Sequence, residues 1–176
     1  MKGRGELVLY LDFDGVLHHE NVLWHKNFGT YLSAPDGHVL FQHAELLEQL
    51  LAPHPEVQIV LSTTWVRRYG LTKAAKNLRP ALRSRVVGAT FRRGMDVTEF
   101  DRLSRGQQVW ADVARRRPRD WLALDDAHED WPVECLDKFV RTHKYEGLCG
   151  PGVLADVREK LRLVTQGFPD RHHRSG

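Results

Sequence analysis

The chain contains almost no cysteine and no long apolar run. Cys135 and Cys149 are the only 2 cysteines among 176 residues, which excludes a disulfide-stapled secreted fold and fits a reducing cytosol. The first apolar run, Leu7–Leu11, stops at Asp12. It is too short for a secretory signal, and no stretch approaches the roughly 20 apolar residues of a membrane helix. We therefore expect a cytoplasmic protein with no membrane segment.

Internal repeats, low-complexity blocks and domain linkers are also missing. With 41% hydrophobic and 28% charged residues, the composition is that of an ordinary globular protein with one sizeable core. We expect a single domain over residues 1–166 with a small flap inserted at 15–40. The polar tail at 167–176 is expected to be disordered.

The net charge of +3 is small, but it is unevenly spread. Residues 67–119 hold 13 Arg and 2 Lys against four carboxylates, a local charge of +11, so the remainder carries about −8. Such asymmetry favours a polyanionic partner. The alternative is that these arginines only decorate solvated helix faces, and the sequence leaves both interpretations open.

Apolar periodicity predicts alternating strands and helices. Short apolar runs predict buried strands at 7–11, 57–61, 85–87, 121–124 and 138–140. Helical spacing predicts helices at 41–51, 65–78 with a break near Gly70, 104–117 and from Gly150-Pro151 onward, with a β-hairpin flap at 18–39 and a polar loop from 88 to 103. This alternation implies an α/β fold with a mostly parallel sheet, a three-layer Rossmann-like domain with a minimal β-hairpin cap.

Polar side chains follow three of the predicted strands at their carboxyl ends. Asp12 and Asp14 follow the first strand, three hydroxyls (Ser62, Thr63 and Thr64) follow the second, and Asp125 and Asp126 follow the Trp121–Leu124 strand. Open α/β sheets bind ligands at this edge. The pattern therefore predicts an active site there.

The two carboxylates after the first strand suit acid–base and nucleophilic chemistry. Asp12 and Asp14 are two residues apart, so both can reach one site. One carboxylate can attack a phosphoryl group, and the other can protonate the leaving oxygen and later activate water. Asp125 and Asp126 can complete an oxygen-rich Mg²⁺ site.

Hydroxyls and a cation would bind the phosphoryl oxygens. Ser62 and Thr63 offer donors, and Arg105 lies at the predicted start of the 104–117 helix, where an anion is favoured. The Arg guanidinium matches the geometry of a phosphate. The other candidates for this cation are Arg102, Lys73 and Arg67.

These motifs together resemble the haloacid dehalogenase-like (HAD) superfamily over roughly residues 7 to 164. The resemblance lies in Leu9–Val16, in Ile59–Trp65 and in Leu122–Asp126, with Arg105-Gly106 as a less certain third motif. Arg105-Gly106, together with Gly88-Ala-Thr90 and Gly147-Leu148, is similar to the HAD domains attached to bacterial RNA-repair proteins.

The resemblance implies a role for each site residue. Asp12 would be the nucleophile and Asp14 the general acid and base, while Thr63, with Ser62 as its rival, would bind the phosphoryl group. Mg²⁺ would be held by the side chains of Asp12 and Asp125 and by the backbone carbonyl of Asp14. Asp126 would belong to the same metal site in a role that stays open.

Two positions depart from the family pattern. Gln108 stands where the family has an acidic residue, which we interpret as a surface change, and Cys149 stands where a Thr is usual. Neither departure removes a predicted catalytic group.

The sequence thus predicts a Mg²⁺-dependent phosphomonoester hydrolase that forms an aspartyl-phosphate. Its substrate is either a nucleic-acid or nucleotide phosphate end or a small phosphorylated metabolite, and RNA-repair proteins are candidate partners. Trp24, Phe28 and Tyr31 of the flap could stack on a base or pack on their own domain, and His18 or His19 could touch the substrate. A non-catalytic module that only binds a phosphate end is the alternative from another class.

Overall fold

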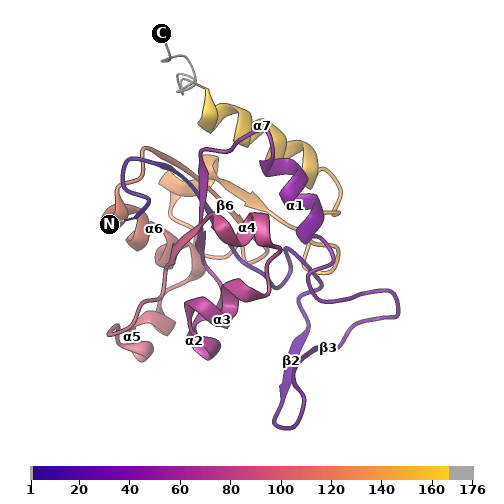
Figure 1. Cartoon of the computed structure of the whole chain (residues 1–176). Coiled ribbons are helices and arrows are strands. Elements are labelled where there is room, and N and C mark those ends of the chain that lie inside the picture. Colours follow the sequence, from indigo (N-terminus) through magenta and orange to yellow (C-terminus); the bar gives the residue numbers. More distant parts are fainter. Residues whose placement is uncertain (1, 167–176) are drawn as a thin grey trace.

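The computed structural model describes residues 2–166, so the predicted tail at 167–176 lies outside the described residues. Its main strands are β1 (Leu7–Leu11), β4 (Val57–Leu61), β5 (Val86–Ala89), β6 (Asp120–Asp125) and β7 (Phe139–Arg141). They form one parallel sheet in the order β5-β4-β1-β6-β7 (Figure 1). The sheet confirms the predicted parallel α/β architecture.

Strand β1 lies at the centre of the sheet, with β4 on one side and β6 on the other. All five of its residues are buried. Leu7, Leu9 and Leu11 belong to one hydrophobic core, and Val8 and Tyr10 belong to the other. Since side chains alternate along a strand, an unbroken apolar run is what a strand covered on both faces requires.

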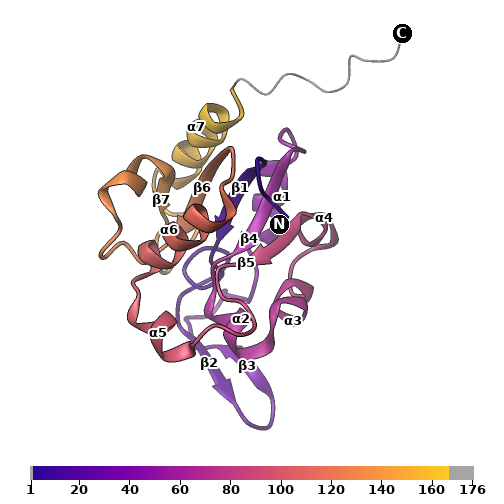
Figure 2. The same cartoon turned by 90° about the vertical axis from the view of Figure 1, so that its left-hand side faces the viewer.

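Helices cover both faces of this sheet and make it the middle of three layers. They are α1 (Ala44–Leu51), α2 (Thr64–Tyr69), α3 (Leu71–Lys76), α4 (Pro80–Ser84), α5 (Val97–Arg102), α6 (Arg105–Arg116) and α7 (Val153–Thr165), with a 3₁₀ helix η1 (Val133–Lys138). Helices α1 and α7 lie side by side on one face, where Leu47 and Val157 join the larger core (Figures 1 and 2). Helix α6 packs on the other face through Val109.

The helix boundaries differ from the predictions where the backbone leaves the helical region. Helix α1 begins at Ala44 and not at Phe41, because Phe41 has a φ of 60°. Helix α7 begins at Val153, since Gly152 has a φ of 77°. The break between α2 and α3 falls at Gly70, as predicted, where φ is 80°.

Two short helices stand where the sequence predicted none. Helix α5 replaces part of the expected loop from 88 to 103, and the Asp96 side chain caps it by accepting the N–H of Glu99. Helix α4 begins at Pro80, just beyond the end of the predicted 65–78 helix. Proline is suited to the first turn of a helix, because its missing N–H would have no partner there.

The flap is an antiparallel hairpin of β2 (Val22–His25) and β3 (Gly29–Leu32). It extends away from the sheet beside α2 (Figure 1). The chain reverses at residues 26–28, so the paired strands are shorter than the predicted 18–39 hairpin, and residues 33–37 form a separate loop. Across residues 2–166, every helix is too short or too polar to span a bilayer.

Candidate active site

The parallel register brings the polar strand ends together. Leu11 of β1 is aligned with Leu61 of β4 and with Leu124 of β6. The next residues on the three strands are Asp12, Ser62 and Asp125, all of which are buried. The predicted meeting of these residues at one edge of the sheet is confirmed.

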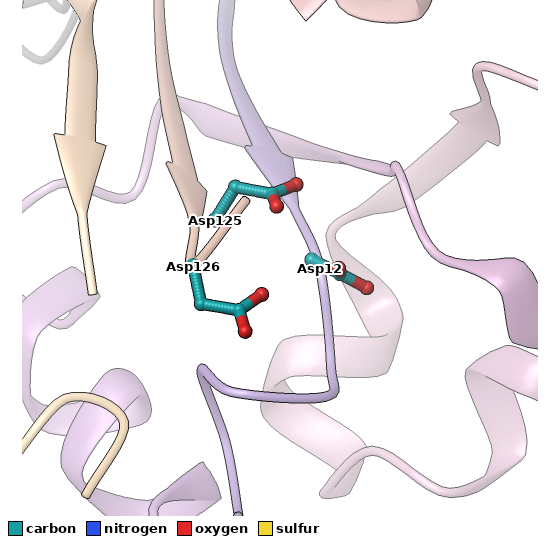
Figure 3. A group of neighbouring side chains, drawn as sticks. All are labelled: Asp12, Asp125 and Asp126. Atoms are coloured by element: carbon teal, nitrogen blue, oxygen red, sulfur yellow. The ribbon is translucent and has the colours of Figure 1, made fainter. Parts of the chain in front are cut away.

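Three carboxylates gather at this edge. Asp12, Asp125 and Asp126 each offer one oxygen, and these oxygens all lie within 4.8 Å of one another (Figure 3). Gly15 makes room for this arrangement, because a Cβ on Gly15 would lie 2.3 Å from the carboxyl carbon of Asp126. Gly15 also has a φ of 68°, which other residues rarely adopt.

Burial and mutual repulsion disfavour the ionised form of all three acids. Burial and the nearby charge of Asp12 raise the pKa of Asp126 to about 6. The same two causes raise the pKa of Asp125 well above its usual value, and burial raises that of Asp12. Oδ2 of Asp125 is buried and accepts no hydrogen bond from the described residues, and Arg105 contacts it only as an ion pair. A hard divalent cation fits this set of oxygens, because it would neutralise the repulsion between the acids.

Arg105 connects two of these acids. Its Nη2 donates to Oδ2 of Asp12 at 3.2 Å, and its Nε lies 3.1 Å from Oδ2 of Asp125. Helix α6 holds Arg105 in its first turn, where Ser104 and Gln107 form a capping box. Arg105 is thus the candidate cation that contacts Asp12.

None of the other candidate cations forms an ion pair with Asp12 in the part of the chain that the structure describes. Arg102 and Lys73 are exposed on α5 and α3. Arg67 forms an ion pair with Asp101 and lines a cavity that Arg105 also lines.

That cavity lies beside Asp12 and has room for an anion the size of phosphate. Its volume is about 160 Å³, and it is lined by Thr63, Thr64, Arg67, Phe100, Arg105, Gln108 and Ala127. The hydroxyl of Thr63 faces Asp12 closely enough to lower the pKa of that carboxyl, although burial outweighs it. Ser62, the rival of Thr63, does not line the cavity, and its buried hydroxyl lacks a hydrogen-bond partner among the described residues. The geometry therefore favours Thr63.

Asp14 is held by two donors whose contact with it the sequence did not predict. Trp65 Nε1 donates to Oδ1 of Asp14 at 2.8 Å, and His18 Nε2 lies 3.0 Å from the same oxygen. The backbone N–H of Phe41 donates to Nδ1 of His18, so the imidazole proton must be on Nε2 and point to Asp14. Both donors therefore fix Oδ1 and leave Oδ2 for a substrate.

The prediction that Gln108 is a surface change was wrong. Gln108 is half-buried, and its side-chain oxygen accepts a hydrogen bond from Arg105 at 3.3 Å. Its amide nitrogen donates to the carbonyls of Phe100 and Leu103. A neutral amide at this position holds Arg105 without competing with Asp12 for its charge.

Comparison with known proteins identifies the family of this chain. A family model described as the HAD domain in Swiss Army Knife RNA repair proteins matches residues 8–153. No curated protein and no solved structure matches the chain significantly. The matched segment runs from β1 to the start of α7 and includes every residue of the site described above. The chain therefore belongs to the family of HAD domains in Swiss Army Knife RNA repair proteins.

Proposed function

We propose that this protein is a Mg²⁺-dependent phosphomonoester hydrolase that works through an aspartyl-phosphate on Asp12. Membership of the HAD family supports a phosphatase-like hydrolase. The observation that carries the proposal is the position of Asp12. Its carboxylate lies between the phosphate-sized cavity with Arg105 and the two acids at the end of β6.

The first step would transfer the phosphoryl group to the protein. Oδ2 of Asp12 attacks phosphorus, the bond to the leaving oxygen breaks, and Asp14 donates its proton to that oxygen. Arg105 and Thr63 bind the non-bridging phosphoryl oxygens. Oδ1 of Asp12 accepts the N–H of Phe13 at 2.7 Å, whereas Oδ2 faces Arg105 and the cavity that it lines, which supports Oδ2 as the attacking atom.

The second step would return the protein to its starting state. Asp14, now ionised, takes a proton from a water molecule, and the hydroxide oxygen attacks phosphorus. The bond between phosphorus and Asp12 breaks, and inorganic phosphate leaves. Two hydrogen bonds from His18 and Trp65 keep Asp14 in one position through both steps.

Asp12, Asp125 and Asp126 would hold Mg²⁺ with their side chains, and Asp14 with its backbone carbonyl. The ion neutralises negative charge on the transferring phosphoryl group and on the acids around it. Hard oxygen ligands favour Mg²⁺ over softer metals.

A phosphorylated end of a nucleic acid is the substrate that we favour over a small metabolite. The association of the family with RNA repair supports it, and RNA-repair proteins are the corresponding partners. A pocket of about 470 Å³ lies between Asp14 and the hairpin, which suits a large leaving group. Trp24 and Phe28 of the hairpin are 51% and 64% exposed. Arg68 lies over the Trp24 ring and Phe28 stacks on His25, and the exposed surface that remains on each ring would let a base stack there.

Phosphate release by the wild type and by Asp12→Asn tests this function. The substrates are p-nitrophenyl phosphate and RNA and DNA oligonucleotides with 3′- or 5′-phosphates, each with Mg²⁺ and with EDTA. We expect release that needs Mg²⁺ and Asp12 and that is fastest on one oligonucleotide end. Release from the small ester alone would point to a metabolite, and no release at all would leave a phosphate-binding module.

A further inference from the structure

We propose that a cationic groove beside β5 binds the backbone of a single-stranded nucleic acid whose phosphorylated end lies in the active site. This inference rests on the function proposed above. The groove has a volume of about 660 Å³. It lies on the side of the molecule that Figure 2 turns toward the viewer, with α6 on one side of β5 and α2 and α3 on the other.

The groove is strongly positive. Its 6 charged lining residues are all cations, namely Lys2, Arg67, Arg92, Arg93, Arg115 and Arg116. Two carboxylates pair with them from outside the lining: Asp101 contacts Arg67, and Asp112 contacts Arg115 and Arg116. Six cations against two acids leave a net charge of about +4 around one groove, which attracts a polyanion.

The fold explains why the groove exists. On the α6 face of the sheet, the smaller core covers β1, β6 and Val60 of β4, but Val87 of β5 is only partly buried. Arg116 reaches across this uncovered end of the sheet. A Cβ on Gly88 would lie 3.2 Å from Nη2 of Arg116, so a larger residue at position 88 would crowd that guanidinium.

The surface between the cations is apolar. It is formed by Val66, Leu71, Val87, Ala89 and Phe91. A single-stranded nucleic acid presents both phosphates and unpaired bases, so it can contact the arginines and this apolar surface together. An acidic protein segment or a chain of phosphates alone would leave the apolar part of the groove without a matching surface.

Arg67 connects the groove to the active site. It lines the groove, the phosphate-sized cavity with Arg105, and the pocket beside Asp14. Helix α2 leads from Thr64 at the active site to Gly70 at the groove. Six residues of helix rise by about 9 Å, which is roughly the length of two to three stacked nucleotides. A strand whose end phosphate lies at Thr63 would therefore reach the groove within a few nucleotides.

Two exposed arginines test this groove without touching the catalytic residues. Arg92 and Arg93 lie on the loop after β5, and neither pairs with a carboxylate in residues 2–166. The double variant Arg92→Ala/Arg93→Ala is compared with Arg83→Ala/Arg158→Ala, which removes the same charge from exposed positions on α4 and α7. Fluorescence anisotropy in an Asp12→Asn background measures binding to a phosphorylated single strand of about ten nucleotides.

We expect the groove variant to bind the oligonucleotide about threefold to thirtyfold more weakly, as two exposed charge contacts predict. The slope of log K against log salt should become shallower by about 1.4, because each phosphate contact of a single strand contributes about 0.7. The control variant should keep the wild-type affinity and slope. With Asp12 present, the groove variant should raise KM for the oligonucleotide and leave p-nitrophenyl phosphate hydrolysis unchanged.

An equal loss of oligonucleotide affinity in both double variants would overturn the proposal, since the overall charge of the protein would then account for binding. An unchanged slope of log K against log salt in the groove variant would overturn the proposal as well. These outcomes differ from a failure of the phosphatase function. That failure would appear as no hydrolysis of p-nitrophenyl phosphate by the wild type, while the anisotropy would still measure the groove.

Discussion

Replacing Trp65 with Phe removes one of the two hydrogen bonds that hold Asp14 and keeps an aromatic ring at the same position. The lost bond is the 2.8 Å contact from Nε1, and the contact from His18 at 3.0 Å remains. A hydrogen bond to a charged group contributes about 1.5–3 kcal/mol. Because His18 still holds Asp14, we take the lower value, which corresponds to about a tenfold loss in rate.

The loss should depend on the leaving group. The first step on an alkyl phosphate expels a poor alkoxide, which needs the proton of Asp14, so kcat/KM should fall about tenfold. The p-nitrophenolate ion leaves without a proton, so kcat/KM for p-nitrophenyl phosphate should change less than about twofold. The comparison uses kcat/KM because kcat also contains the second step, in which Asp14 acts as the base for both substrates.

Tyr69→Phe is the matched control. Tyr69 packs edge-on against Trp65, and its hydroxyl contacts Thr30 rather than Asp14. The Tyr69 variant should keep the wild-type ratio of the two rates. Equal losses of kcat/KM on both substrates in Trp65→Phe, or no loss on either, would refute a positioning role for Trp65.

The remaining predictions concern the acidic cluster. Gly15→Ala should weaken Mg²⁺ binding about tenfold to a hundredfold in calorimetry, whereas Gly29→Ala, with a φ of 77° and no atom near its Cβ, should not. In EDTA, the free energy of unfolding in urea should fall by about 1–2 kcal/mol as pH rises from 4 to 6. The reason is that the folded-state pKa of Asp126, about 6, lies above its ordinary 3.8, so the acid favours folding only while protonated. Asp126→Asn should make this slope shallower and leave the contributions of Asp12 and Asp125, whose pKa values burial also raises, and Mg²⁺ should reduce it. Arg105→Ala should lower kcat/KM about 100-fold to 1,000-fold in phosphate-release assays, yet tighten Mg²⁺ binding, since it removes a competing cation from Asp12. An unchanged Mg²⁺ affinity in Gly15→Ala or in Arg105→Ala, or a flat pH profile, would contradict the assigned geometry.

The sheet and the acidic edge could be predicted from the sequence because their signals are local. The three central strands are apolar runs, interrupted only by Gln58 in β4, and each run ends directly in Asp or in hydroxyl residues. Parallel pairing then aligns those ends without further information. Arg105 was predictable for a similar reason, since Ser104 marks the start of its helix.

The parts that escaped prediction depend on contacts between distant segments. Trp65 is 51 residues from Asp14, and no periodicity relates them. His18 is oriented by the backbone N–H of Phe41, which lies beyond the whole hairpin. Helix α5 has only Phe100 as a buried residue, so its apolar pattern was too weak to distinguish it from a loop.

Detection of a phosphorylated Asp12 tests the central claim most directly. The protein is mixed with Mg²⁺ and a phosphomonoester, quenched with acid during turnover, digested and measured by mass spectrometry. We predict one peptide that contains Asp12 and carries the added mass of a phosphoryl group, and its absence from Asp12→Asn. Rapid phosphate release by the wild type with no phosphorylated peptide, or a modified peptide that does not contain Asp12, would contradict the account.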